Sequence, residues 1–259
     1  STSILTLPSG NEKIYVARLK YIPNNSEKNK IHKRNEKISK INEGIFTSNI
    51  LQLKPFEKIY SFGYFNDESY FSKAKLGLSE LFQIDISSEL INQKSDTNNN
   101  LFKEKYLQPG TNSLRIGGTI QTFSQERGDF LSSAFRFSFG RVLGNVRDGY
   151  LFGEFINSYK LNEKIYLNLN PKFSYTGNGD IYSMGSSLNL KLNKWFEIIP
   201  ETNISMSNAE NNISLTNRLL LNKNLYLDAF LTNAYGSIDM AQQFKKENFR
   251  YGIKVNLKF

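Results

Sequence analysis

The sequence predicts an all-β protein: a closed antiparallel up-and-down β-barrel of about 14 strands, with about 12 or about 10 strands as the alternatives. Three observations support this prediction. Apolar and polar residues alternate along most segments, a short turn motif recurs, and tight turns and long polar connections fall at opposite ends of the expected strands.

The alternation is clearest in the last segment. Over residues 249–259 every odd position is apolar or aromatic, and every even position is polar or glycine. A period of two indicates a strand with one wet and one apolar face, because successive side chains of a strand point to opposite faces. The same period returns at residues 135–139, 165–175 and 184–192. These segments are therefore expected to be strands of the same kind.

A recurring turn motif separates the alternating segments. Residues 161–167 (LNEKIYL), 192–198 (LNKWFEI) and 221–227 (LNKNLYL) share one frame, and residues 78–84 are a looser copy. The first three copies begin 31 and then 29 residues apart, which is typical of hairpins laid side by side. Longer polar connections at residues 176–180, 207–211 and 236–248 fall between these turns. Short turns at one end and long loops at the other are the asymmetry of transmembrane β-barrels.

Counting by this rule places about 14 strands, most of them long enough for a tilted strand to cross a bilayer. They are expected at residues 12–22, 44–53, 57–65, 70–78, 82–91, 113–123, 132–141, 149–159, 164–175, 181–192, 195–206, 212–221, 224–235 and 249–259. Segments 44–53 and 57–65 alternate poorly, which leaves the lower counts open. Pro171 and Pro200 fall inside expected strands, where each removes a hydrogen-bond donor and requires a bulge or a strand end.

The whole chain is expected to form one barrel domain. Residues 1–11 would be a short N-terminal extension, and residues 23–43 and 92–112 would be long polar loops. The first seven residues lack the basic start and apolar core of a signal peptide, so we expect either a cytosolic chain or a mature form without its signal peptide.

Composition excludes several functional classes. The chain has no cysteine and one histidine, His32, which excludes disulfide scaffolds, thiol catalysis and cysteine-based metal clusters. His32 has no apparent partner for acid–base or nucleophilic chemistry. We therefore expect no enzyme activity, no catalytic residue, no metal site and no cofactor. The net charge of +9 favours polyanionic surroundings. Nucleic acid is not expected, because Phe135 and Phe137 point away from Arg136 across the strand.

Aromatic residues are abundant, with 14 tyrosines and 20 phenylalanines beside one tryptophan. Several lie near the ends of the expected strands, where aromatic girdles mark the two membrane interfaces. These residues are Tyr159, Tyr175, Trp195, Phe196, Tyr235, Phe249 and Phe259.

The C-terminal residues carry a resemblance to a known class. Arg250, Gly252, Val255, Leu257 and Phe259 fit the pattern polar-x-Gly-x-x-hydrophobic-x-hydrophobic-x-Phe. This resembles the insertion signal of bacterial outer-membrane β-barrel proteins of the porin-like kind. The resemblance implies an outer-membrane location, contact with membrane lipids and lipopolysaccharide, and recognition of Gly252, Val255, Leu257 and Phe259 by the barrel-assembly machinery.

If Phe259 faces lipid, the parity of each strand assigns its inward side chains. The inward cations would be Arg18, Lys20, Lys73, Lys75, Arg115, Arg136, Lys172, Lys191, Arg218, Arg250, Lys254 and Lys258. The inward anions would be Asp85, Glu89, Glu154, Glu197, Glu201 and Asp228. Such an excess of cations lining a pore would favour anions. The alternative is that these groups form salt-bridged ladders that hold neighbouring strands together without transport.

The sequence therefore predicts a passive outer-membrane channel for small hydrophilic solutes or ions, with a weak preference for anions. The alternative is a non-conducting barrel that serves as a structural anchor or a surface-binding module. A soluble all-β binding protein is a third hypothesis. The filling of the lumen distinguishes the first two, because a barrel of about 14 strands leaves room for water unless a plug occupies it.

Overall fold

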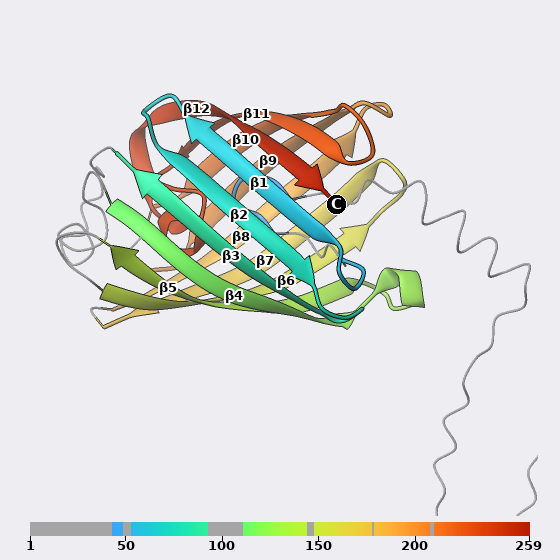
Figure 1. Cartoon of the computed structure of the whole chain (residues 1–259), viewed down its shortest axis with the longest axis horizontal. Helices are drawn as coiled ribbons and strands as arrows, with labels where there is room; N and C mark the ends of the chain where they lie inside the picture. The colour runs from blue at the N-terminus through green and yellow to red at the C-terminus, as the bar shows by residue number, and fades with distance from the viewer. Residues whose placement is uncertain (1–42, 49–52, 93–110, 144–147, 178, 208–209) are drawn as a thin grey trace, which may run out of the picture. The chain divides into compact units, whose positions relative to one another are not determined.

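The computed structural model describes residues 43–48, 53–92, 111–143, 148–177, 179–207 and 210–259. The chain divides into two units, Ser1–Ile38 and Ser39–Phe259, and all of these residues belong to the second. The second unit contains one closed barrel in which each strand pairs antiparallel with its neighbours (Figure 1). Its strands are β1 (Lys58–Phe65), β2 (Tyr70–Gly77), β3 (Phe82–Ile91), β4 (Thr111–Phe123), β5 (Ser132–Leu143), β6 (Asp148–Lys160), β7 (Ile165–Thr176), β8 (Gly179–Lys191), β9 (Phe196–Ser205), β10 (Asn212–Leu220), β11 (Leu225–Ala234) and β12 (Lys245–Lys258).

The described part of the chain has twelve strands, and the barrel closes where β1 pairs with β12. The expected number of about 14 is therefore wrong, and the alternative of about 12 is confirmed. The expected strand at residues 44–53 fails because residues 43–48 form no strand. Ile45 and Phe46 are neighbours in sequence and both are buried, whereas a strand of this barrel would bury only one of them. The expected strand at residues 12–22 lies outside the described residues.

The alternation of apolar and polar residues in the sequence corresponds to the outer and inner faces of the barrel wall. On β5, Arg136 and Ser138 are buried inside the barrel, while Phe135, Phe137 and Phe139 are exposed on its outer face. Large apolar side chains recur on the outer face around the barrel, among them Phe62, Ile116, Leu169, Ile213 and Ile253. An apolar outside with a polar inside is the arrangement of a transmembrane β-barrel. Among the described residues, no helix is both long and apolar enough to span a bilayer.

The recurring turn motif closes hairpins through its asparagine. The backbone N–H groups of Lys164, Trp195 and Asn224 each donate to the side-chain oxygen of the asparagine two residues earlier, at 2.8 Å in all three turns. This local bond stabilises a tight turn without any partner from another strand. These turns lie at the same end of the barrel as the C-terminus (Figure 1).

Both strand prolines lie where the pairing of neighbouring strands is interrupted. Between β6 and β7 the pairing stops at Lys172 and resumes at Asn168. There the Asn157 side chain donates to the Leu169 carbonyl at 3.0 Å. Between β8 and β9 the pairing is interrupted between Glu201 and Ile198. The missing N–H groups of Pro171 and Pro200 therefore fall in gaps of the ladder, as proline in a closed sheet requires.

One of the expected interface aromatics is not at the interface. Tyr175, Trp195, Phe249 and Phe259 are exposed. Tyr235 is fully buried, because the chain turns into the barrel directly after β11.

Candidate functional site

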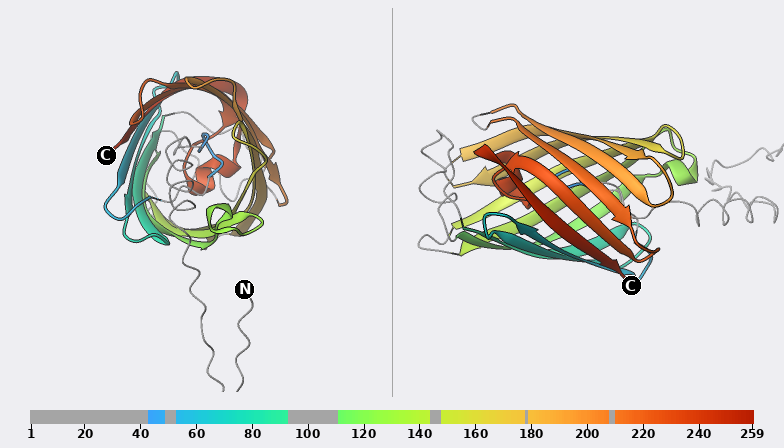
Figure 2. Two further views of the ribbon diagram at one scale, coloured as in Figure 1. Left: turned by 90° about the vertical axis from the view of Figure 1, so that its right-hand side faces the viewer. Right: turned by 90° about the horizontal axis from the view of Figure 1, so that it is seen from above.

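Two segments of the described part of the chain lie inside the ring of strands, which we call the wall. We call residues 43–48 the N-terminal insert, and residues 235–244, which connect β11 to β12, the β11–β12 insert. The second contains the 3-10 helix η2 (Asp239–Gln243). The view along the barrel shows both segments within the ring (Figure 2, left). Of the long polar connection expected at residues 236–248, residues 236–244 therefore enter the lumen, whereas residues 245–248 belong to β12.

The N-terminal insert is held through its backbone by Glu201 of β9. The Glu201 carboxylate accepts hydrogen bonds from the N–H groups of Ile45 at 2.7 Å, Phe46 at 3.3 Å and Thr47 at 2.8 Å. A Cβ atom on Gly44 would lie 2.1 Å from the carboxylate carbon of Glu201. Position 44 therefore requires glycine for the insert to approach this carboxylate.

Cations of the wall bind the carbonyl groups of the same insert. Lys254 donates to the Gly44 carbonyl at 2.8 Å, Lys172 donates to the Phe46 carbonyl, and Arg218 donates to the Glu43 carbonyl. At the end of the insert, the Ser48 hydroxyl donates to Glu154 at 2.6 Å. These N–H and carbonyl groups of the insert are thus paired with side chains of the wall, as buried backbone requires.

A second glutamate holds the β11–β12 insert in the same way. Glu89 of β3 accepts from the Ser237 N–H at 2.6 Å, the Ser237 hydroxyl at 2.9 Å and the Ile238 N–H at 3.3 Å. Arg250 donates to the carbonyls of Ala234 and Tyr235, both at 2.7 Å. Each insert is therefore held by one wall glutamate on its N–H groups and by at least one wall cation on its carbonyls.

Each insert also brings one carboxylate into contact with wall cations. Asp239 of η2 lies 2.7 Å from Arg136 and 3.3 Å from Arg115, and it accepts a hydrogen bond from Ser138. Glu43 pairs with Lys75 and lies 3.5 Å from Lys73. Burial raises the pKa of the Glu43 carboxyl, but Lys73 and Lys75 lower it by more. Glu43 therefore remains ionised.

All described side chains that parity assigns inward lie on the inner side of the wall. Two further assigned residues, Arg18 and Lys20, lie outside the described residues. Most of the described side chains are buried, whereas Lys73 and Lys191 are partly exposed. They form ion pairs: Arg115 with Asp85, Arg136 with Glu154 at 3.3 Å, and Asp228 with both Arg218 at 2.7 Å and Lys254 at 2.9 Å. The salt-bridged ladders considered from the sequence are present in this conformation, and the role of these residues in a pore stays a prediction.

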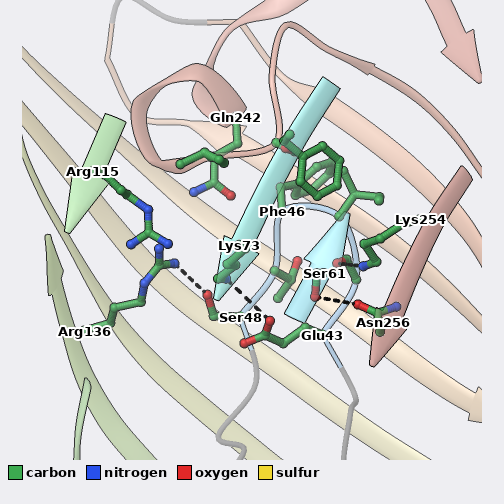
Figure 3. A pocket seen from close by; sticks show the side chains of 16 residues that line it. Glu43, Phe46, Ser48, Ser61, Lys73, Arg115, Arg136, Gln242, Lys254 and Asn256 are labelled. Carbon is green, nitrogen blue, oxygen red and sulfur yellow. Dashed lines mark hydrogen bonds and ion pairs between the residues drawn. The ribbon is translucent and has the colours of Figure 1, made fainter. Parts of the chain in front are cut away.

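A small cavity of about 40 Å³ remains between the two inserts. Its lining includes Phe46, Ser48, Lys73, Arg115, Arg136 and Gln242 (Figure 3). This volume is about the space of one or two water molecules. A solute larger than water would not pass through this part of the lumen unless an insert moved.

The sequence reasoning considered residues 23–43 as a segment that narrows the lumen, but it missed residues 44–48 and 235–244 as lumen segments and assigned no role to Glu43 or Asp239. Both lie in connections without alternation, so parity gave no direction to their side chains. In the described part of the chain, no group of three or more His, Cys, Asp or Glu residues could hold a metal ion.

No protein-family model and no curated protein matches the sequence. Among solved structures, a KdgM porin in complex with disordered oligogalacturonate has a TM-score of 0.55 and 9% identity, covering 78% of this chain and 99% of its own. An outer membrane channel from Pseudomonas putida has a TM-score of 0.53 and 10% identity, covering 85% of this chain and 100% of its own. The NanC porin has a TM-score of 0.50 and 7% identity, covering 78% of this chain and 98% of its own.

At these identities the likeness concerns the fold. The chain has the fold of bacterial outer-membrane porins and channels, and this confirms the fold that the C-terminal pattern implies. The bacterial outer membrane is the location of barrels of this class.

Proposed function

We propose that the protein is an outer-membrane channel for small hydrophilic solutes or ions with a weak preference for anions, and that the described conformation is its closed form. The two inserts close the lumen, and solute passes when they are displaced. The proposal is carried by one observation: neither insert belongs to a strand, and the backbone of each is held by side chains of the wall rather than by strand pairing. Such bonds can be exchanged for bonds to water when an insert leaves.

The preference for anions follows from the wall. Among the described residues that parity assigns inward, ten are cations and six are anions. Charges in a wet pore act through a screened potential, with a Debye length of about 10 Å at 0.1 M salt and about 3 Å at 1 M. The preference is therefore modest and weakens as salt rises.

The second candidate is the non-conducting barrel, and one observation favours it. Tyr235, Met240 and Phe244 of the β11–β12 insert belong to an apolar cluster with Ile91, Phe152 and Ile181 of the wall. Burial of this kind stabilises a fixed plug. A plug that never leaves would make the barrel an anchor or a binding module.

Planar-bilayer recordings of the refolded full chain test the channel. Glu201→Ala and Glu89→Ala each remove the glutamate that holds one insert, and both should raise the open probability above that of the parent protein. Glu163→Ala, in an exposed turn, is the control and should leave it unchanged. Absence of conductance in the parent and in both release variants, all shown to be folded by heat-modifiable gel mobility, would favour the non-conducting barrel.

Reversal potentials in a KCl gradient test the selectivity of the open channel. The expected shift favours chloride and shrinks at 1 M salt, and replacing Arg115, Arg136 and Lys191 by glutamate should move it toward potassium. A channel that prefers potassium from the start would contradict the assignment of the wall cations to the pore.

A further inference from the structure

We propose that Lys73, Lys75, Arg115 and Arg136 form a binding site for a solute with two or more carboxylate groups, and that Glu43 and Asp239 occupy this site while the channel is closed. The inference rests on the proposed function, because a solute reaches these cations only when the inserts leave. It adds the class of solute and the event that would open the lumen.

The two insert carboxylates each bind a pair of cations on the wall. Asp239 lies against Arg136 of β5 and Arg115 of β4, at 2.7 and 3.3 Å. Glu43 lies against Lys73 and Lys75 of β2. Carboxylates of a solute are the chemical equivalent of these two groups, and guanidinium groups bind carboxylates with favourable geometry.

The wall by itself provides too few carboxylates to pair with all of these cations. Asp85 pairs with Arg115 and lies 3.9 Å from Arg136, and Glu154 lies 3.3 Å from Arg136. Glu154 is also shared with Lys172, at 3.9 Å. Asp85 and Glu154 therefore pair with three cations, Arg115, Arg136 and Lys172. Among the described residues, Lys73 and Lys75 form their ion pairs with Glu43 of the insert. Removal of the inserts would leave an excess of positive charge that attracts anions.

Three of the four cations, Lys73, Arg115 and Arg136, face the same space, and Lys75 joins them through Glu43, which contacts both Lys73 and Lys75. Glu43, Lys73, Arg115 and Arg136 all line the cavity between the inserts, and Figure 3 shows the two guanidinium groups beside each other and directed toward the region of Lys73 and Ser48. Arg115 and Arg136 are buried. Nη1 of Arg115 and Nε of Arg136 have no hydrogen-bond partner within the described residues. Buried donors without partners are a reason to expect a ligand.

The backbone of Asp239 gives an independent sign that its carboxylate is held in place by the site. Its φ angle is 43°, in the left-handed region that residues other than glycine seldom adopt. Such a conformation persists where surrounding contacts stabilise it. The contacts that do so here include the ion pairs with Arg115 and Arg136, so a competing anion would remove part of the support for the insert.

The mechanism that follows is competition. A polycarboxylate binds the wall cations only in molecules whose inserts have left, so its apparent affinity is reduced by the fraction of open molecules. Weakening the internal carboxylates should raise that fraction and tighten binding. Weakening the wall cations should abolish binding in either background.

Isothermal titration calorimetry of the refolded full chain, at constant ionic strength, tests this with citrate, acetate and glucose as probes. The double variant Glu43→Gln/Asp239→Asn keeps the shapes of the side chains and should bind citrate at least about tenfold more tightly than the parent. Adding Arg115→Gln and Arg136→Gln should remove the gain. The matched control, Glu80→Gln/Glu163→Gln, makes the same change in net charge on exposed turns and should bind citrate as the parent does.

The inference is overturned if the folded double variant binds citrate no more tightly than the control, or binds acetate or glucose equally well. If the double variant does not fold, Glu43→Gln alone decides, with a smaller gain expected. Conductance without citrate binding would overturn the site and leave the channel intact. Citrate binding with no conductance in the release variants would support the site and contradict the proposed channel.

Discussion

Replacing Glu201 by alanine should loosen the N-terminal insert by an amount that the structure allows us to work out. The carboxylate accepts three backbone N–H bonds, at 2.7, 3.3 and 2.8 Å. A hydrogen bond to a charged group contributes about 1.5 to 3 kcal/mol, but water that enters the lumen of the variant would recover part of it. We take about 1 kcal/mol for each bond, hence about 3 kcal/mol in all. At about 1.4 kcal/mol for each factor of ten, the population with a displaced insert rises about 100-fold.

The variant should not release the insert completely. Lys254 still binds the Gly44 carbonyl, Lys172 still binds the Phe46 carbonyl, and Ser48 still donates to Glu154. Phe46 and Ile45 also keep their apolar packing against Phe65, Phe71 and Phe230. Glu201→Gln retains one acceptor oxygen without the charge, so its effect should lie between those of the parent and Glu201→Ala.

Thiol labelling can follow the insert because the chain has no cysteine. Thr47 is buried, and in Thr47→Cys a membrane-impermeant maleimide would react when the insert leaves the wall. Adding Glu201→Ala should raise the labelling rate about 100-fold, adding Glu201→Gln should raise it less, and adding Glu163→Ala should not change it. Equal rates in all four proteins would refute the assignment of Glu201 as the residue that holds the insert.

The remaining predictions concern β12. Polarity-sensitive dyes attached singly at Tyr251, Ile253 and Leu257, which are exposed on the outer face, should report lipid. Dyes at Arg250, Lys254 and Asn256, which are buried on the inner face, should report polar surroundings. Uniform signals along the strand would contradict its orientation. Phe259→Ala should lower insertion into bacterial outer membranes. It should change the unfolding free energy of the refolded barrel by less than about 1 kcal/mol, because the Phe259 ring is exposed and makes an edge contact with Tyr60. Efficient insertion of the variant would show that the terminal aromatic is not a recognition element here.

The wall could be predicted from the sequence because two local patterns specify it. A membrane on one side and a wet lumen on the other impose the same period of two on every strand, as β5 and β12 show. The asparagine turns at Asn162, Asn193 and Asn222 are complete within two residues, so their meaning does not depend on distant contacts. Parity alone then places Glu89, Glu201 and Arg250 on the inner side of the wall.

The strand count failed where the pattern was weakest. Residues 44–48 contain apolar residues at a spacing that a strand tolerates, but their polar backbone groups are paired with side chains of the wall instead of with another strand. Backbone groups carry no sequence signature. A segment bound through its N–H and carbonyl groups therefore looks like any short connection. Gly44 is a local sign of this close approach, because a side chain at position 44 would collide with Glu201. It can be recognised as such only when the position of Glu201 in the structure is known.

The same limit applies to the β11–β12 insert, and it changes how the lumen charges are interpreted. The parity of the strands assigns only the side chains of the wall, and among these the inward cations outnumber the inward anions. The field that a solute meets also depends on Glu43 and Asp239, which parity cannot assign. With the inserts bound, these two carboxylates compensate the cations of β2, β4 and β5 at contact distances. With the inserts displaced, the same cations face water. The anion preference that we propose therefore belongs to the open barrel, in which the insert carboxylates no longer compensate the wall cations.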